Sequence, residues 1–376
     1  MRGNHYEMGL QHGTKVVNMR PLIEAAMAPH LRHLEGRPGV EHLFQELREV
    51  LEQIAVPMLE MIRGQAEGLG MDYATLLRYA CSYYLEERTK PGRAPRKADE
   101  GCTTWAASNG ATADGAPILV KNRDTNVERM PIGVVMTAEP NDGYRYLCST
   151  NAGSPGVPSS GMNEKGLCVA DTRDSHLDCG PGLPYQSLMM GVLEKNDSVR
   201  SALAFLKGVR RIGGSNLILA DAQGDMAVFE AGHTRYGILE ARDHVLVNAN
   251  HPVSAEMQGY TSGIATESLT NSLRRYDRTQ RELQNLRGRI NAEQAKRMMA
   301  AHDENPVPLC RHDLRGSIGS RIATISCAIY LPANRQLIIS EGSPCQGKYQ
   351  TYSLKDTQED RCQNDAIGRT ACFATE

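Results

Sequence analysis

A glycine followed by a cysteine, Gly101 and Cys102, carries the most informative chemistry in the sequence. The pair lies in ADEGCTTWAAS, between a basic, proline-containing stretch and a segment of strand composition. A thiol held bent against the preceding carbonyl can attack it, so that the amide becomes a thioester and water then divides the chain. Glycine suits the position before the break, because it tolerates strained backbone angles and leaves its carbonyl unshielded.

Cleavage at this junction would give Cys102 a free α-amine. Such an amine has a pKa of about 7.7–8.0, far closer to neutrality than that of lysine, so it can act as general base to its own thiol. One residue would then supply both nucleophile and base. The alternative is a core cysteine at the start of a strand, and the dipeptide alone does not separate the two.

Composition narrows the class of protein. Hydrophobic residues make up 40% and charged residues 23% of the 376 residues, as in folded globular proteins. The net charge of −2 has scattered signs, and the one basic cluster, RTKPGRAPRK at 88–97, fits a solvated loop, so we expect no nucleic-acid partner. No apolar run of about 18 residues and no apolar signal segment are present, so we expect a cytoplasmic chain with no membrane partner.

The cysteines and histidines show no metal-binding spacing. No CxxC pair and no HExxH motif occurs, and His30 with His33 fits the surface of a helix. We therefore expect reduced cysteines, no metal and no cofactor. The ten cysteines are Cys81, Cys102, Cys148, Cys168, Cys179, Cys310, Cys327, Cys345, Cys362 and Cys372.

The first hundred residues have helical patterns. Within 42–70, apolar residues recur at spacings of three and four, and Pro57 is expected to kink or divide the helix. Gly9 and Gly13, four residues apart, would give one helix a small face for close packing.

From residue 102 the pattern changes to short strands separated by Gly, Asn, Asp and Pro. Helical patterns return at 186–208 and 262–301, and GSPCQGK (342–348) is expected to be a turn, because Tyr349 replaces the Ser or Thr of a phosphate loop. Consecutive strands with helices inserted in blocks favour an α+β fold with antiparallel sheets. The expected strands are TTWAAS, APILVKN, IGVVMTAE, YRYLCST, GLCVAD, NLILAD, MAVFEAG, HVLVNAN, RIATISCAIYL and RQLIIS.

Six segments in one order resemble the acyl-coenzyme A:6-aminopenicillanic acid acyltransferase family of the N-terminal-nucleophile hydrolase superfamily. They are HYEMGLQHG (5–13), EGCTTW (100–105), VKNRD (120–124), GMNEKGLCVA (161–170), VNANHP (247–252) and SRIAT (320–324). The resemblance implies a four-layer αββα fold of mainly antiparallel sheets. It further implies one domain over 1–376, processed into an α chain (1–101) and a β chain (102–376) that remain together as a heterodimer; a higher homo-oligomer stays open.

The resemblance also implies roles for four residues. Cys102 is the nucleophile, Asp124 holds the new α-ammonium, Asn250 stabilises the oxyanion, and Arg321 lowers the thiol pKa or binds a carboxylate. The structural alternatives are a turn aspartate, a turn asparagine and a surface salt bridge. Arg123 departs from the family, which has an aromatic residue before the aspartate.

Three further polar residues are left out of the catalytic set. We expect Asn163 and Ser320 to be turn formers, and His251 to be structural, because the α-amine makes another base unnecessary.

The implied activity is acyl transfer through a Cys102 thioester, from a small-molecule amide or acyl thioester. Water as acceptor would make the enzyme an amidase and an amine would make it an acyltransferase; acyl-CoA as a substrate stays open. One alternative is a penicillin V or bile-salt type amide hydrolase, although those relatives remove a much shorter leader. Another is an unprocessed binding homologue, against which the intact Cys102, Asp124, Asn250 and Arg321 argue.

Overall fold

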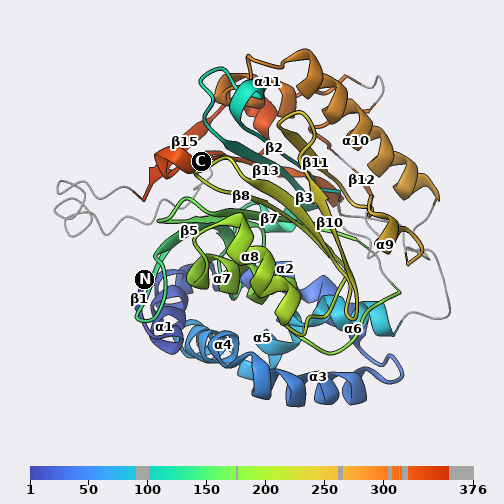
Figure 1. Ribbon diagram of the computed structural model, residues 1–376. Coiled ribbons are helices and arrows are strands. Elements are labelled where there is room, and N and C mark those ends of the chain that lie inside the picture. Colours follow the sequence, from blue (N-terminus) through green and yellow to red (C-terminus); the bar gives the residue numbers. More distant parts are fainter. Residues whose placement is uncertain are drawn as a thin grey trace.

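Two β-sheets stacked face to face lie between two layers of helices, as Figure 1 shows. The computed structural model describes residues 1–89, 101–174, 177–260, 266–303, 307–312, 314–315 and 321–354. The expected α+β, αββα architecture is confirmed. The basic stretch at 90–97 falls outside the described residues, as do Ser320, Cys362 and Cys372.

The helices fall into two groups along the chain. Those before residue 210 cover one sheet, and α10 and α11 cover the other (Figure 1). Their bounds are α1 His5–Lys15, α2 Arg20–Leu34, α3 Val40–Ile54, α4 Val56–Leu69, α5 Tyr73–Ala80, α6 Ser82–Arg88, α7 Tyr185–Lys195, α8 Val199–Gly208, α9 Ala255–Gln258, α10 Thr266–Asn285 and α11 Ala292–Met299.

Neighbouring strands are antiparallel in both sheets, except that β1 is parallel to β4. The first sheet has the order β1 (Arg2–Gly3), β4 (Gly133–Pro140), β5 (Tyr146–Asn151), β6 (Ser160–Asn163), β7 (Cys168–Arg173), β8 (Ser215–Ala220), β9 (Met226–Ala231), β10 (Tyr236–Glu240). The second has the order β11 (Val245–Asn248), β2 (Thr103–Ala107), β3 (Ile118–Asn126), β13 (Arg321–Leu331), β14 (Gln336–Ser340), β15 (Tyr349–Ser353), with β12 (Leu314–Arg315) beside β13.

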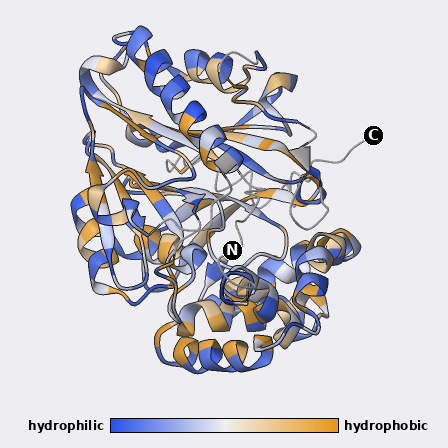
Figure 2. Ribbon diagram, turned by 90° about the vertical axis from the view of Figure 1, so that its right-hand side faces the viewer, coloured by the Kyte–Doolittle hydropathy of each residue, from blue (hydrophilic) through white to orange (hydrophobic). Residues whose placement is uncertain are grey.

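Alternation along the strands explains why both faces of each sheet are buried. In β8, Leu217 and Leu219 pack against the helices of the first half, whereas Ile218 enters the core between the sheets. In β3, Leu119 enters the same inter-sheet core, and Val120 faces α10 and α11. Strands that are covered on both faces therefore contain consecutive apolar residues in the sequence. Figure 2 shows apolar residues in the sheets and in the helix faces that cover them.

The helical pattern at 42–70 and the small face of the first helix are confirmed, whereas His30, expected on the surface of a helix, is buried. The pattern at 42–70 is two helices, α3 and α4, and Pro57 lies in the first turn of α4, where its missing N–H costs nothing. Gly9 and Gly13 of α1 face α4, and the backbones approach so closely that a Cβ at Gly9 would collide with the carbonyl of Met61.

The expected strands are all present, and the structure adds short ones. The sequence did not indicate β1, β6, β10, β12 or β15. Strands β1 and β12 have two residues each, β6 has four, and β15, YQTYS, is a polar edge strand. The segment 342–348 is a turn with one 3-10 turn, η5 (Pro344–Gln346), as expected.

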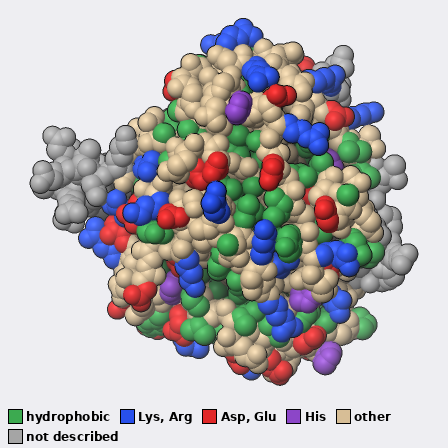
Figure 3. Space-filling model, in the orientation of Figure 1, with side chains coloured by type: hydrophobic (Ala, Val, Ile, Leu, Met, Phe, Trp, Pro, Cys, Tyr) green, Lys and Arg blue, Asp and Glu red, His purple; other side chains and the backbone are tan. Residues whose placement is uncertain are grey.

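The face of the molecule that Figure 3 shows carries charged side chains of both signs. Lys and Arg side chains are interspersed with Asp and Glu there. Within the described residues, no helix is long and apolar enough to cross a membrane.

The α1–α4 contact gives a stability prediction. Gly9→Ala should lower the free energy of unfolding by about 1–3 kcal/mol, because the added methyl group forces the two backbones apart. Gly208→Ala is the matched control: a Cβ there meets nothing within 4 Å, so the change should be neutral or slightly stabilising. Thermal unfolding of both variants measures the difference, and equal melting temperatures would contradict the close packing.

Candidate active site

The pairing of β2 brings the predicted residues to one end of the second sheet. Asn248 of β11 pairs with Thr104 of β2, and Asn250 and Cys102 each lie two residues beyond that pair. On the other side, Thr103 pairs with Asn122 of β3, so the continuation of β2 runs toward Asp124. Cys102 is 8% exposed, and the backbone N–H of Asp124 donates a hydrogen bond to its thiol.

Asp124 is buried and held by two donors. Its Oδ1 accepts a hydrogen bond from Thr324 Oγ1 at 2.7 Å, across the β3–β13 pair, and its Oδ2 accepts one from Arg311 Nη1 at 3.3 Å. Burial raises the pKa of Asp124, and the Arg311 and Arg275 guanidiniums oppose that rise. The guanidinium of Arg311 also lies against Gly101, where a Cβ would collide with it. Glycine thus fits this position sterically.

Arg275 of α10 joins the predicted cleavage site to Asn250. Its Nη1 donates to the carbonyl oxygen of Cys102 at 2.7 Å and to Thr103 Oγ1 at 2.9 Å, and its Nη2 donates to Asn250 Oδ1 at 2.9 Å. The side chain is 1% exposed. One guanidinium therefore fixes the start of β2 relative to the loop after β11.

Asn250 and His251 both depend on Ser272 of α10. The backbone N–H of Asn250 donates to Ser272 Oγ at 2.9 Å, and Asn250 Nδ2 donates to the carbonyl of Arg173 at 2.8 Å. His251 Nδ1 shares a 2.7 Å hydrogen bond with the same Ser272 hydroxyl. Burial and then the nearby Arg275 lower the pKa of His251 to about 4, so its ring is neutral at pH 7.

The structure does not bring Arg321 into the contacts described for this group. Arg321 is exposed at the start of β13, where it pairs with Arg315 of β12. Among the contacts of the described residues, the guanidiniums of Arg275 and Arg311 reach Gly101, Cys102 and Asp124. Asn163 lies in the β6–β7 turn, where its Oδ1 accepts from the backbone N–H groups of Lys165 and Leu167, as a turn former does.

Residues 111–346 match the sequence profile of the family described as acyl-coenzyme A:6-aminopenicillanic acid acyl-transferase. The matched residues make up more than half of the 376-residue chain. The chain belongs to this family. Asp124, Asn250 and Arg321 lie within the matched residues of this acyltransferase-family chain, whereas Gly101 and Cys102 precede them.

Solved structures with a weak overall likeness include two hydrolases. A mutant conjugated bile acid hydrolase from Clostridium perfringens has a TM-score of 0.45 at 14% identity, covering 68% of this chain and 98% of its own. Penicillin V acylase from Agrobacterium tumefaciens has a TM-score of 0.41 at 15% identity, covering 64% and 82%. No curated protein matches the chain.

A buried ion pair faces the thiol from the inter-sheet side. Lys121 Nζ donates to Asp171 Oδ1 at 2.6 Å and to the carbonyls of Asp171 and Ser159, with 2% of Lys121 exposed. Burial raises the pKa of the Cys102 thiol, and the Lys121 ammonium works against that rise. A cation near a buried thiol favours the reactive thiolate.

Sequence inspection missed Lys121, Arg275 and Arg311, although two of them left a signal. Lys121 interrupts the apolar run ILVKN, and a charge inside a fully covered strand needs a partner. On α10, Ser272, Arg275 and Thr279 recur at helical spacing and are all buried, which marks a polar face turned inward. Arg311 lies outside the helices and strands, and no local pattern identifies it.

A cationic pocket lies at Arg123, the residue before Asp124 in β3. Arg123 lies on the opposite face of β3 from Asp124, and its Nη1 donates a hydrogen bond to Asn151 Oδ1 at 3.0 Å. Arg129 and Arg173 also line the pocket, together with His30 and Tyr185, and no Asp or Glu is among the described residues that line it. The residue that departs from the family pattern, Arg123, thus gives this pocket part of its positive charge.

Arg275 gives a prediction with an internal control. Arg275→Lys should lower the melting temperature and disturb any reaction at Cys102, because one ammonium cannot reach three acceptors in the geometry of a guanidinium. Each lost hydrogen bond from a charged donor typically costs about 1.5–3 kcal/mol. Arg274→Lys, at the exposed neighbouring position, should leave both unchanged. If the two variants behave alike, Arg275 does not organise the site.

Proposed function

We propose that the chain is a self-processing N-terminal-cysteine acyltransferase or amidase. The observation that carries this proposal is the placement of Cys102 at the head of β2, with Asp124 beside the thiol and Arg275 on its carbonyl oxygen. Family membership supports the acyl-transfer chemistry.

In the proposed cleavage, the Cys102 sulfur attacks the carbonyl carbon of Gly101. The C–N bond of the peptide breaks, the amine of Cys102 takes a proton, and a thioester forms between Gly101 and the sulfur. Water then hydrolyses the thioester, which releases the Gly101 carboxylate and regenerates the thiol. Arg311, whose guanidinium lies against Gly101, is placed to stabilise the negative charge that develops there.

In the proposed catalytic cycle, the free α-amine takes the thiol proton as the sulfur attacks the substrate acyl carbon. The proton then passes to the leaving group, and the acyl group remains on Cys102 as a thioester until water or an amine accepts it. Asp124 would hold the α-ammonium, and the Asn250 side-chain amide would stabilise the oxyanion with the hydrogen that it does not donate to Arg173.

The cationic pocket indicates a substrate with negative charge. Arg123, Arg129 and Arg173 would favour an amide or acyl thioester that carries a carboxylate or another anion. Acyl-CoA fits this class as a substrate, and no cofactor is needed for the chemistry. The role of Arg321 stays a prediction, because its described position is exposed at the edge of β13.

The α and β chains would remain together after cleavage. Helices α1–α6, which precede the junction, and strands β4, β5 and β7–β9, which follow it, contribute to one hydrophobic core. Separation would expose that core to water, so we propose a stable heterodimer that acts as one domain.

Self-cleavage is tested on a denaturing gel. Purified protein should run as two fragments, and the larger should begin with CTTWAAS. Cys102→Ala should stay uncut and inactive, and Cys102→Ser should cut slowly, because a hydroxyl is the poorer nucleophile. An active preparation that shows only the full-length chain would overturn the proposal.

The catalytic roles are tested by three substitutions. Asp124→Asn and Asn250→Ala should fold and lose activity, with a loss of about 10²–10³ in kcat for the oxyanion donor. His251→Gln should retain substantial activity. Because the pKa of His251 is lowered to about 4, its ring is neutral throughout pH 6–9, and a change in rate over that range reports another group.

Iodoacetamide labelling identifies the nucleophile independently. Inactivation should coincide with modification of Cys102 at the start of the β chain. If labelling of another cysteine accounts for the inactivation while Cys102 stays unmodified, the assignment fails.

A further inference from the structure

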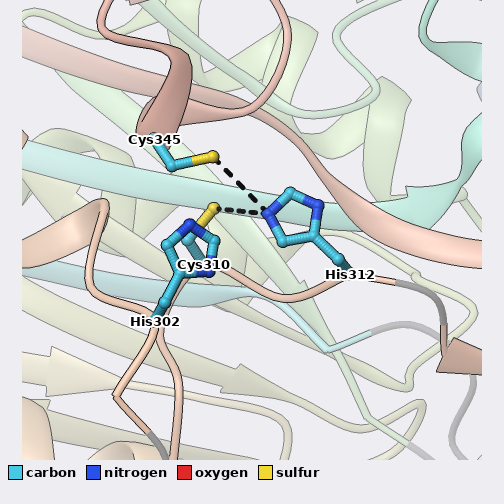
Figure 4. Close-up of side chains that lie close together, drawn as sticks. All are labelled: His302, Cys310, His312 and Cys345. Carbon is cyan, nitrogen blue, oxygen red and sulfur yellow. Dashed lines mark hydrogen bonds between the residues drawn. The ribbon is translucent and has the colours of Figure 1, made fainter.

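Two cysteines and two histidines from three separate segments lie close together near Arg311. His302 follows α11, Cys310 and His312 flank Arg311, and Cys345 lies in η5. Figure 4 shows the four side chains directed toward one another, with both sulfur atoms hydrogen-bonded to the His312 ring. The set does not include Cys102, and nothing in the proposed reaction uses it.

The distances fit a tetrahedral metal ion. Four ligand atoms, one from each side chain, lie within 4.8 Å of one another. Around tetrahedral zinc, bonds of about 2.3 Å to sulfur and about 2.0 Å to nitrogen place the two atom types roughly 3.5 Å apart. His312 Nε2 lies 3.3 Å from Cys310 Sγ and 3.6 Å from Cys345 Sγ. The two sulfur–nitrogen separations therefore already match those expected around a tetrahedral zinc ion.

The ligand chemistry selects the ion. Thiolate and imidazole suit Zn²⁺, whereas Mg²⁺ and Ca²⁺ need oxygen ligands, and no Asp or Glu belongs to the set. Two thiolates neutralise the charge of one Zn²⁺, and four protein ligands leave no open position, as in structural zinc sites. Cys310 is buried while the other three ligands are exposed, so the ion has a route to the site.

We propose that His302, Cys310, His312 and Cys345 form a structural zinc site, which departs from the metal-free chain expected from the sequence. The ion would tie together the end of α11, the segment 310–312 and η5. Arg311, between two ligands, would thereby be held against Asp124 and Gly101, a consequence that rests on the proposed function.

Metal content tests the site directly. Elemental analysis of the purified chain should find about one zinc ion per chain. After a chelator has removed the zinc, added Co²⁺ should give the absorption spectrum of a tetrahedral thiolate complex. Cys345→Ser and His302→Asn, both at exposed positions, should weaken binding by at least about tenfold without affecting folding. Cys310→Ser, which is buried, is the more severe variant.

Cys179→Ser and His244→Asn are matched controls outside the set, and both should keep the metal. Unchanged zinc in the ligand variants would overturn the proposal. So would a wild-type chain without zinc in which peptide mapping finds Cys310 and Cys345 joined by a disulfide.

The uncut Cys102→Ala chain separates this proposal from the proposed function. It should bind zinc as the wild type does, because none of the four ligands contacts the thiol in the described structure. Removal of zinc from newly made wild-type chain should slow the appearance of the two fragments. Zinc binding without self-cleavage would refute the proposed function alone, and self-cleavage that never depends on zinc would refute the link through Arg311.

Discussion

The hydrogen bonds of Thr324 hold the candidate site together. Thr324 Oγ1 donates to Asp124 and accepts from the backbone N–H of Arg311, while its own N–H donates to the carbonyl of Arg311. Its carbonyl accepts from Ser343, just before η5. The register between β3 and β13 shifts immediately after this residue. Without these hydrogen bonds, only the 3.3 Å contact between Arg311 Nη1 and Asp124 Oδ2 would hold Arg311 against β3, and its contact with Gly101 would be weakened.

Charge balance around the thiol follows from this geometry. Lys121, Arg275 and Arg311 surround a region that contains the carboxylates of Asp124 and Asp171, and all five side chains are largely buried. Burial of unpaired charges would be costly, so each ion has a hydrogen-bonded partner. The Lys121 ammonium works against the rise that burial causes in the pKa of the Cys102 thiol, and the surrounding cations disfavour a charged α-amine. In the proposed mechanism, attack begins from the thiol and a neutral α-amine, which takes the thiol proton.

The parts of the site that could be predicted from the sequence lie within local patterns. Cys102 and Asn250 lie next to strands and Asp124 lies within β3, and pairing of these strands brings the three together. Pro57 indicated the division between α3 and α4, and the two glycines of α1 indicated a closely packed helix. Arg275 and Arg311 act through contacts between segments about 170 or more residues apart in the chain. No spacing rule anticipates them. The same is true of the group formed by His302, Cys310, His312 and Cys345, whose cysteines show no CxxC pair. Arg321 was selected by family order, and its role stays a prediction.

The helices before the junction are part of the fold rather than a detachable leader. Tyr83 donates hydrogen bonds to the carbonyls of Asp174 and Gly214, and the N-terminal amine donates to the carbonyl of Thr137 in β4. Each apolar side chain buried in this layer stabilises it by about 1.5–3 kcal/mol. A single break at Gly101 removes one covalent link and none of these contacts. Cleavage would therefore free the Cys102 amine while leaving the surrounding side chains in place, because the elements that position them are anchored on both sides of the break.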